Sequence, residues 1–498
     1  MKIQFNKYIK YGLFSACITM GLTSCDKHFE KLNTDPNEPT TTATSFLLGN
    51  AQKYMMDYTW DEWFNGRRGN QLAQYWASNQ YSNESRYALR VTITNDYWGF
   101  FYARALRDLQ EIINLNEANP DGYTKFGKSE NQIAVAKTLQ AWTYQNMTDS
   151  WGPIPFSQAL QYESYPFPKY DSQQEVYTGL LSMLNEAING FDVNDETLKG
   201  DLIYDGNIAK WKKFANSLKM RVALRIADVE PTTAATAVSE AIASGVFTSN
   251  ADNALFQYVN GAPNNNPFAE DYKTRNDFAA SNTMVDELNR LGDPRVGFYY
   301  SPNSAGNYVG EVYGLTEADA AVTLDADISQ RNPQVLAETA PGIYMDYAQV
   351  EFMMAEAAER GMGGAGSAAT HYNNGITASM QYWDASGSLS AADISNYIAQ
   401  PEVDYTTLMG TETWKQVIGR QKWIALYMQG VQGWAEYRRL DFGILQAPAG
   451  GTLDGSGIPN RMKYPTDEMT LNGEQYATGV SLLGGADDLD TKLWWDVN

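Results

Sequence analysis

The feature that most constrains the fold is a helical spacing of apolar residues that recurs along the chain. In residues 207–229 (NIAKWKKFANSLKMRVALRIADV), apolar side chains such as Trp211, Phe214 and Leu218 recur at intervals of three or four positions. That spacing places them on one face of an α-helix, and Lys212, Lys213 and other polar residues fall on the opposite face. The chain is therefore predicted to be mainly α-helical.

Similar spacing predicts further helices, several of which come as pairs joined by a short loop. Antiparallel helix pairs that stack on their neighbours are the unit of tetratricopeptide-like solenoids, although the chain shows no strict repeat period. The predicted pairs are 132–147 with 175–188, 208–227 with 233–243, and 347–358 with 368–383, and one more helix is predicted over 415–434.

Three long segments between the predicted helices lack this spacing and are rich in Asn, Gly, Pro and Tyr. They are residues 261–277, 299–314 and 446–498. Long segments without regular structure are unusual inside compact domains and tend to be functional. We therefore expect the binding surface in these segments.

The first 25 residues have the order of a secretory signal. Lys2, Lys7 and Lys10 precede a short apolar run at 13–22, which is too short to span a bilayer. Leu22-Thr23-Ser24-Cys25 is typical of a bacterial lipobox, whose cysteine receives a lipid before cleavage, so residues 1–24 are predicted as signal peptide and Cys25 as the lipidated residue. An unmodified signal peptide with an incidental cysteine stays open.

The residues after Cys25 are predicted to be a leash that connects a lipid anchor to a single helical domain. Residues 25–44 contain Pro36, Pro39 and a threonine-rich run, a composition typical of an extended linker. Residues 45–498 then form the domain. No later stretch approaches the roughly 18 to 20 continuous apolar residues of a spanning helix, so membrane contact is expected through the anchor.

Charge and aromatic content narrow the class of partner. The net charge is −22. Without residues 1–24 it becomes −25, because 34 basic and 59 acidic residues remain. Such a surface repels nucleic acid, so none is expected as a partner. The chain has 13 Trp and 32 Tyr, and Tyr well exceeds the 19 Phe, as suits recognition of ligands such as sugar rings. Tyrosines at the edge of a helical core, with hydroxyls in water, explain the same excess.

Motifs for catalysis, cofactors and metals are weak. The chain has two histidines, His28 and His371, and neither a G-x-S-x-G nor an H-E-x-x-H pattern nor a Cys/His cluster. GMGGAG at 361–366 follows a predicted helix where a dinucleotide site needs a strand, so we interpret it as a helix end and a turn. The acidic run at 487–490 lacks calcium-ligand spacing and is interpreted as solvated charge. No cofactor or metal is expected.

Seven ordered segments resemble elements of the SusD/RagB family of outer-membrane nutrient-binding lipoproteins, particularly its SusD-like branch. No single segment is distinctive, but the order spans nearly the whole mature chain. The segments are LNTDPN (32–37), DSWGPIPFSQAL (149–160), WKKFANSLKMRVALRI (211–226), LGDPRVGFYY (291–300), YAQVEFMMAEAAERG (347–361), RQKWIALYMQGVQGWAEYRRLDF (420–442) and IPNRMKYPTDEMTLN (458–472).

This resemblance implies a mainly α fold in which four tetratricopeptide-like helix pairs support an irregular, loop-rich binding face. It implies a non-enzymatic lipoprotein of the outer membrane that faces the cell exterior. Such a protein captures oligosaccharides, or in some members peptides, for a SusC-like TonB-dependent transporter. Two alternatives stay open: a glycoside hydrolase with a carboxylate pair, whose separation sequence spacing does not give, and an assembly partner of the transporter without a ligand of its own.

Candidate ligand-binding residues come from composition, because stacking rings beside amides and charges suit sugar recognition. Trp76 is excluded, since its helical spacing with Leu72 predicts a core position. Arg420, Arg438, Arg439 and Arg461 are expected to order carboxylates and backbone carbonyls within the fold. The candidates are Trp60, Asp61, Trp63, Asn65, Arg67, Asn79 and Tyr81 in a first cluster, and Tyr272, Arg275, Tyr299, Tyr300, Tyr308 and Tyr313 in a second.

Overall fold

Helices carry most of the regular structure in the computed structural model of the chain, which describes residues 42–195, 197–455 and 457–498. The strands among these residues form two-stranded antiparallel pairs of two to four residues per strand. The mainly α prediction is therefore confirmed. Cys25, the predicted signal peptide and most of the predicted leash lie outside the described residues. Helix α3 (Thr44–Thr59) begins at the last residue of that leash.

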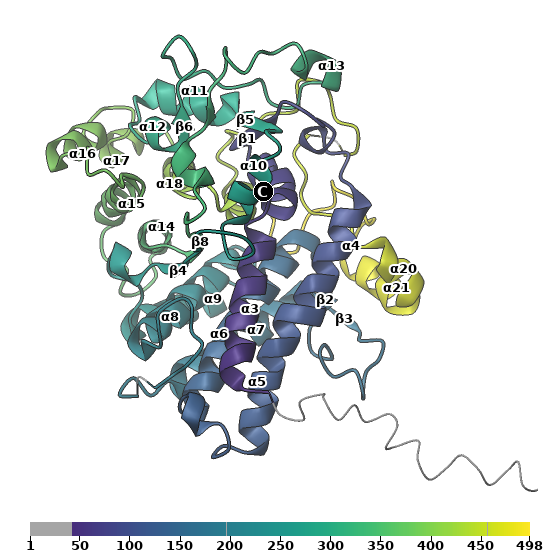
Figure 1. Cartoon of the computed structure of the whole chain (residues 1–498). Coiled ribbons are helices and arrows are strands. Elements are labelled where there is room, and N and C mark those ends of the chain that lie inside the picture. Colours follow the sequence, from purple (N-terminus) through teal and green to yellow (C-terminus); the bar gives the residue numbers. More distant parts are fainter. Residues whose placement is uncertain (1–41, 196, 456) are drawn as a thin grey trace, which may run out of the picture. The chain divides into compact units, whose positions relative to one another are not determined.

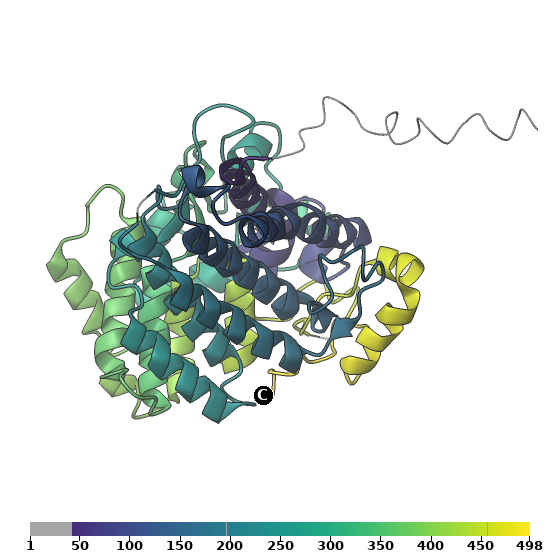
Figure 2. The ribbon, with the colours of Figure 1, turned by 90° about the horizontal axis from the view of Figure 1, so that it is seen from below.

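Sequential helices pack against each other in pairs, as predicted. Helix α6 (Ser129–Trp151) packs on α7 (Gln173–Gly190), and α8 (Ile208–Arg225) packs on α9 (Pro231–Ser244). Helix α14 (Tyr347–Glu359) likewise packs on α15 (Ala368–Trp383). Contacts of α7 and α14 with α8 join the pairs, which follow one another in chain order from blue to green in Figures 1 and 2.

The single helix predicted over 415–434 is wrong, because the chain turns in its middle. Helix α18 (Trp414–Ala425) and helix α19 (Gly430–Leu440) form a fourth pair, and Met428 between them has a left-handed φ of 71°. A Cβ on Gly430 would lie 2.1 Å from the carbonyl carbon of Gly69, so this turn needs glycine for its close approach. The apolar spacing hides the break because both helices bury one face.

The turn between α14 and α15 confirms the interpretation of the glycine-rich segment. Gly361 has a φ of 67°, and the N–H of Met362 donates to the carbonyl of Ala357, as in a helix end with a left-handed residue. His371 on α15 lies beside this turn. Its Nδ1 is 2.6 Å from the carboxylate of Glu351 on α14, so it joins the two helices.

Several tyrosines lie in the core with their hydroxyls bonded to backbone carbonyls, which differs from both interpretations of the tyrosine excess. Tyr75 donates to the carbonyl of Trp423 at 2.7 Å, and Tyr300 donates to the carbonyl of Tyr75 at 2.7 Å. Trp423 lies in the last turn of α18, where carbonyls lack a partner within the helix, and the Tyr75 carbonyl also accepts from the Ser281 N–H at 3.3 Å. A buried carbonyl needs a donor. Tyrosine supplies both the ring and the donor.

A buried ionic network joins four of the long helices. Arg225 on α8 contacts Glu436 on α19 at 3.0 Å, and Glu436 also contacts Lys422 at 2.9 Å and Arg439 at 2.6 Å. Arg439 in turn pairs with Glu356 on α14. Arg439 therefore orders carboxylates within the fold, as expected.

The other expected structural arginines behave in the same way. Arg420 pairs with Glu412 at 2.6 Å, and Arg438 donates to the backbone carbonyls of Asp149 and Asn460. Arg461 pairs with Asp487 at 2.6 Å. The interpretation of 487–490 as wholly solvated charge is therefore wrong for Asp487, which also accepts a hydrogen bond from the Tyr464 N–H.

The remaining elements are short and connect or cover the helix pairs. Segment 446–498 is not without helices, contrary to expectation, since α20 and α21 lie in it. Within the residues that the structure describes, no helix is both long and apolar enough to cross a membrane.

The remaining helices are α4 (Val91–Phe100), α5 (Arg107–Ala118), α10 (Pro267–Tyr272), α11 (Asn282–Leu291), α12 (Val296–Tyr299), α13 (Glu317–Ala320), α16 (Ala391–Ile398), α17 (Tyr405–Leu408), α20 (Thr466–Leu471) and α21 (Gly473–Leu482). The 3₁₀ and π segments are η1 (Glu62–Asn70), η2 (Glu84–Arg86), η3 (Phe101–Leu106), η4 (Thr124–Phe126), η5 (Asn250–Asp252) and η6 (Pro333–Leu336). The strand pairs are β1 (Trp76–Ser78) with β5 (Phe278–Ala280), β2 (Ile154–Pro155) with β3 (Tyr170–Asp171), β4 (Ala254–Phe256) with β8 (Gly342–Met345), and β6 (Tyr300–Ser301) with β7 (Gln330–Arg331).

Candidate functional site

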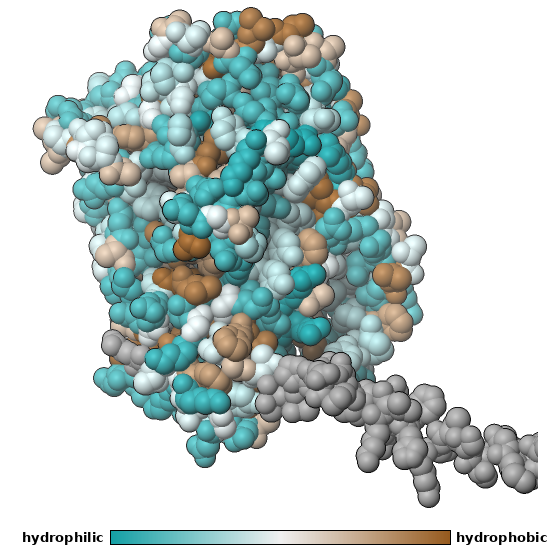
Figure 3. All heavy atoms as spheres, in the orientation of Figure 1, coloured by the Kyte–Doolittle hydropathy of each residue, from teal (hydrophilic) through white to brown (hydrophobic). Residues whose placement is uncertain are grey.

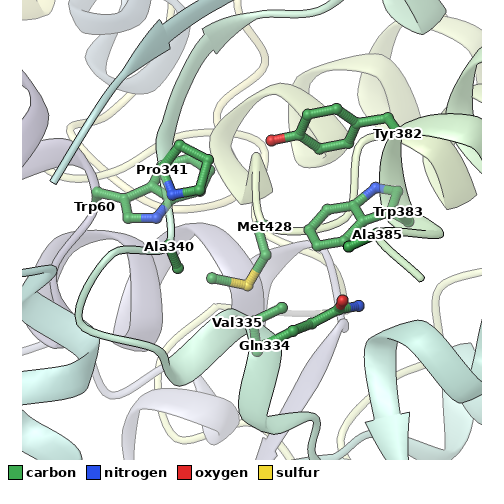
Figure 4. A pocket seen from close by; sticks show the side chains of 9 residues that line it. All are labelled: Trp60, Gln334, Val335, Ala340, Pro341, Tyr382, Trp383, Ala385 and Met428. Atoms are coloured by element: carbon green, nitrogen blue, oxygen red, sulfur yellow. The ribbon is translucent and has the colours of Figure 1, made fainter.

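An open cavity of about 270 Å³, which we call the Trp60 pocket, lies where α15, η6 and the chain before η1 meet. Figure 4 shows Trp60 and Trp383 on opposite sides of it. Trp60 directly precedes the cap of η1, and Trp383 is the last residue of α15. The lining residues are Trp60, Gln334, Val335, Ala340, Pro341, Tyr382, Trp383, Ala385 and Met428.

Asp384 fixes the end of α15 and so fixes Trp383. Its carboxylate accepts hydrogen bonds from the backbone N–H groups of Ser388 at 2.9 Å and Leu389 at 2.7 Å, and from the Ser386 hydroxyl. Burial acts to raise the pKa of Asp384, but these hydrogen bonds outweigh it and hold the pKa below its ordinary value. The carboxylate is therefore charged and occupied in holding the turn.

Buried tyrosines support Trp383 from behind. Its ring lies edge-on to Tyr299 at 5.2 Å and to Tyr427 at 5.5 Å between centroids, geometries that favour aromatic pairs. Tyr299 was predicted to bind ligand, yet it is fully buried and its hydroxyl donates to the Ile424 carbonyl. It packs beneath the pocket instead of lining it.

Asn65 holds the turn that brings Met428 into the pocket. Its Nδ2 donates to the Met428 carbonyl at 2.8 Å, and the side chain is buried. The left-handed backbone of Met428 is thus stabilised from η1. Asn65 was predicted to read ligand hydroxyls, but here it acts as a support.

Gln334 and the Tyr382 hydroxyl are polar groups among the residues that line the Trp60 pocket. Gln334 has an oriented amide. Its Nε2 donates to the Phe298 carbonyl, which fixes the plane of the amide. Among the described residues, none donates a hydrogen bond to its Oε1, which leaves an acceptor for a ligand hydroxyl. The pocket therefore combines aromatic faces with one oriented amide, a combination suited to a sugar ring.

Part of the second predicted cluster, Tyr272 and Arg275, meets the first cluster next to this pocket, because α10 contacts both η1 and η6. Arg67 lies over the ring of Trp63 at 4.9 Å and near that of Tyr81 at 5.8 Å. Arg275, from the second cluster, also lies over the ring of Tyr81, at 4.8 Å from its centroid. Tyr81 remains 47% exposed. Segments 58–82 and 261–277 thus build one cation–π surface.

Acidic partners neutralise the two arginines of this surface. Asp277 contacts Arg67 at 2.5 Å and Arg275 at 2.6 Å, and Glu62 contacts Arg67 at 3.0 Å. The hydrogen bond to Asp277 raises the pKa of Arg275. Because each guanidinium already has a carboxylate, the surface does not favour anionic ligands.

The other predicted residues lie in different environments. Tyr272 is 44% exposed, and Arg331 lies 5.3 Å from its ring centroid, so it borders the same surface. Asp61 caps η1 by accepting from the Phe64 N–H at 2.7 Å, and burial raises its pKa well above the ordinary value. Asn79 is buried, with its Nδ2 3.4 Å from Asp325.

The rest of the second cluster lies away from the pocket. Tyr300 and Tyr313 are buried with their hydroxyls on backbone carbonyls, so the expectation that they line a binding surface does not fit their placement. Tyr308 is half-buried on the 299–314 segment, where its carbonyl accepts from Asn289. Trp76 is fully buried, as predicted.

Sequence reasoning missed most of the pocket. Tyr382 and Trp383 were recognised only as the end of a helix, and Gln334 and Met428 carry no local signal of exposure to a cavity. Trp60 was predicted and does line the pocket. Among the missed residues, the adjacent aromatic pair at a helix end was the signal that could have marked the site. Figure 3 shows that hydrophobic side chains form separate patches on a largely hydrophilic face.

Comparison with known proteins shows which family and which solved structures the chain is similar to. A family model named SusD-like and described as "Starch-binding associating with outer membrane" matches residues 36–465. No curated protein matches the sequence.

Solved structures match over nearly the whole chain. One is a chitin-binding protein, 28% identical, with a TM-score of 0.80 over 91% of this chain and 100% of that one. A SusD homologue from Bacteroides uniformis is 26% identical, with a TM-score of 0.79 over 91% and 100%. A chitin-binding SusD homologue from Flavobacterium johnsoniae is 26% identical, with a TM-score of 0.77 over 91% and 98%.

Proposed function

The chain belongs to the SusD-like family, and from that premise we propose that it is a lipid-anchored protein of the cell surface that captures neutral oligosaccharides at the Trp60 pocket. It then passes them to a partner TonB-dependent transporter in the outer membrane. The anchor is the lipidated Cys25 predicted from the lipobox. The family resemblance supports the transporter and the outer-membrane location.

The observation that carries the proposal is the placement of Trp60 and Trp383 on opposite sides of one open cavity. Trp383 is half-buried and offers the stacking face, whereas Trp60, which is 4% exposed, forms the opposite wall. The C–H faces of a pyranose pack on aromatic rings, and its hydroxyls need an oriented acceptor such as Gln334. The names of two similar structures include chitin binding, which makes chains of N-acetylglucosamine the first ligands to test.

Capture without cleavage is part of the proposal. Hydrolysis of a glycosidic bond requires two carboxyl groups roughly 5 to 10 Å apart across the sugar. The nine described residues that line the Trp60 pocket include no Asp or Glu. The adjacent Asp384 is committed to the turn after α15. These features support a binding role over the glycoside hydrolase alternative.

Calorimetry with the purified protein tests the proposal. Chitohexaose, cellohexaose, maltohexaose and a mixed peptide digest are titrated separately, and at least one saccharide is expected to bind. Trp383→Ala should weaken that binding by about tenfold, because it removes one stacking face. Trp414→Ala is the matched control, since Trp414 is also half-buried but lies on α18 outside the pocket.

The outcome separates the candidate functions. Silence toward all saccharides would contradict glycan capture, and binding of peptides alone would move the ligand to that class. Release of shorter products from a hexaose would favour the hydrolase. Co-purification with a transporter without any soluble ligand would favour the assembly alternative.

A further inference from the structure

A second cavity, of about 390 Å³, lies between α4, α20 and the β2–β3 connection, and we call it the Tyr162 pocket. It shares no lining residue with the Trp60 pocket. In both Figures 1 and 2, α20 and α15 lie on opposite sides of the helices that begin the chain. The two cavities are thus separate sites on one molecule.

The Tyr162 pocket is rimmed by exposed aromatic side chains from one connection. Tyr162 is 76% exposed, Phe167 63% and Tyr165 41%. Exposed rings gathered at a cavity are costly in water and mark binding sites when the rest of the surface is polar. Trp98 and Tyr102, from α4 and η3, line the pocket beneath them.

The connection that carries these rings is held in shape at its base. β2 pairs with β3, and the Asp171 carboxylate accepts from the N–H groups of Phe156 at 3.1 Å and Ser157 at 2.7 Å. The Lys169 N–H donates to the Gln158 side chain at 3.0 Å. Pro166 and Pro168 restrict the backbone further. These contacts hold the base of the connection that carries the rings.

The polar groups of the Tyr162 pocket suit hydroxyl donors. Glu468 on α20 accepts from the Tyr170 hydroxyl at 2.8 Å and from Asn472 at 3.3 Å through Oε2. No described residue donates to its Oε1, which can accept from a ligand. The described lining residues include no Lys, Arg or His, so the carboxylate disfavours anionic ligands.

We propose that the Tyr162 pocket is a second carbohydrate site, which takes a neutral pyranose of a glycan chain on its aromatic rim with hydroxyls on Glu468. The inference rests on the proposed capture of oligosaccharides and adds a second point of attachment. Two sites on one molecule hold a long chain more tightly than either holds a short one, because the second contact becomes intramolecular.

The test compares short and long saccharides on matched variants of the purified protein. Chitotriose, cellotriose and maltotriose are titrated by calorimetry, and the corresponding insoluble polymers are used in pull-down assays. Each wild-type molecule is expected to bind two molecules of the trisaccharide that it recognises. The double variant Tyr162→Ala/Phe167→Ala and the single variant Trp383→Ala should each leave one tight site, with the altered site weakened about tenfold.

Phe46→Ala is the control, because Phe46 is 74% exposed and lines neither pocket. It should leave both stoichiometry and polymer binding unchanged. All the substituted side chains of the Tyr162 pocket are exposed, so unfolding midpoints measured by circular dichroism should match wild type. In each pocket variant, the fraction of protein retained on the insoluble polymer should fall by a larger factor than the affinity for the trisaccharide.

Each result decides the inference. The second site is ruled out if wild type binds one trisaccharide and that binding is weakened by Trp383→Ala but unaffected by Tyr162→Ala/Phe167→Ala. The proposed function is then unaffected. Peptides that bind the Tyr162 pocket, with loss in its double variant alone, overturn it in favour of a protein partner. If no saccharide binds wild-type protein, both the second site and the proposed function fail.

Discussion

Arg275 stacks on Tyr81, with its guanidinium carbon 4.8 Å from the centre of the ring, although the two residues are almost two hundred positions apart in the chain. The same guanidinium pairs with Asp277, which also holds Arg67. This arrangement joins two segments that the sequence predicted as separate aromatic clusters. It forms a half-exposed surface next to the Trp60 pocket.

We expect Tyr81→Ala to weaken hexasaccharide binding by about five- to tenfold and trisaccharide binding less, because a longer ligand reaches from the Trp60 pocket onto this surface. Tyr81→Phe keeps the ring and is the matched control. Calorimetry with the hexasaccharide and the trisaccharide that wild type recognises measures both effects. Equal losses for the two lengths would argue against an extended surface.

Tyr300→Phe should lower the free energy of unfolding by about 1 kcal/mol, because it removes the hydroxyl donor and leaves the buried carbonyl of Tyr75 with the longer hydrogen bond from the Ser281 N–H at 3.3 Å. Chemical denaturation followed by tryptophan fluorescence measures the change. Tyr81→Phe again serves as control, since no described residue bonds to its hydroxyl. An unchanged free energy of unfolding for Tyr300→Phe would mean that the Ser281 N–H alone satisfies the Tyr75 carbonyl.

Glu436→Gln should destabilise the fold by about 3 to 5 kcal/mol, since it removes the charge that Arg225, Lys422 and Arg439 share in the core. Burial already lowers the pKa of Lys422, so loss of Glu436 should favour its neutral form. Asp192→Asn, at the exposed pair with Lys128, should leave the denaturation midpoint unchanged.

The buried side chain of Glu311 should make the free energy of unfolding depend on pH. It is buried, its carboxylate oxygens accept no hydrogen bond from described residues, and burial with repulsion from Asp325 raises its pKa to about 7. A folded pKa above the unfolded value means that the native state binds the proton more tightly. The contribution is therefore fully present below the unfolded pKa and is lost as the pH rises through about 7.

Glu311→Gln should remove this loss. The thermal midpoint of the variant relative to wild type should rise from pH 5 to pH 8, as measured by circular dichroism at matched ionic strength. Glu117→Gln is the control, because Glu117 is exposed on α5. The prediction fails if the difference between Glu311→Gln and wild type is the same at both pH values.

Lipidation at Cys25 is a prediction from the lipobox alone. Mass spectrometry of protein from native membranes should find residues 1–24 removed and an acylated cysteine at the new N-terminus. Cys25→Ser should move the protein from the membrane fraction to the soluble fraction. Cys17→Ser, at the other cysteine of the chain, should not, because Cys17 lies within the predicted signal peptide. An unmodified Cys25 in membrane-extracted protein would contradict the anchor, and protease treatment of intact cells would test exposure at the cell surface.

The helix pairs were predictable because their signal is local. The spacing of Trp211, Phe214 and Leu218 reports a buried face whatever that face packs against, and α8 forms where it was expected. The same locality explains the missed break at Met428. Apolar spacing continues across it, and the cause of the turn is the approach of Gly430 to Gly69, which lies far away in the chain.

The sequence by itself determined the mainly helical fold and the family, and it predicts the lipid anchor. Only the tertiary structure decided which tyrosines face solvent and which bond to carbonyls in the core, as Tyr81 and Tyr300 do respectively. It also decided that Trp60, Gln334 and Trp383 converge on one cavity. The physical reason is that helix formation depends on neighbours along the chain, whereas burial and the shape of a cavity depend on contacts between segments far apart in sequence.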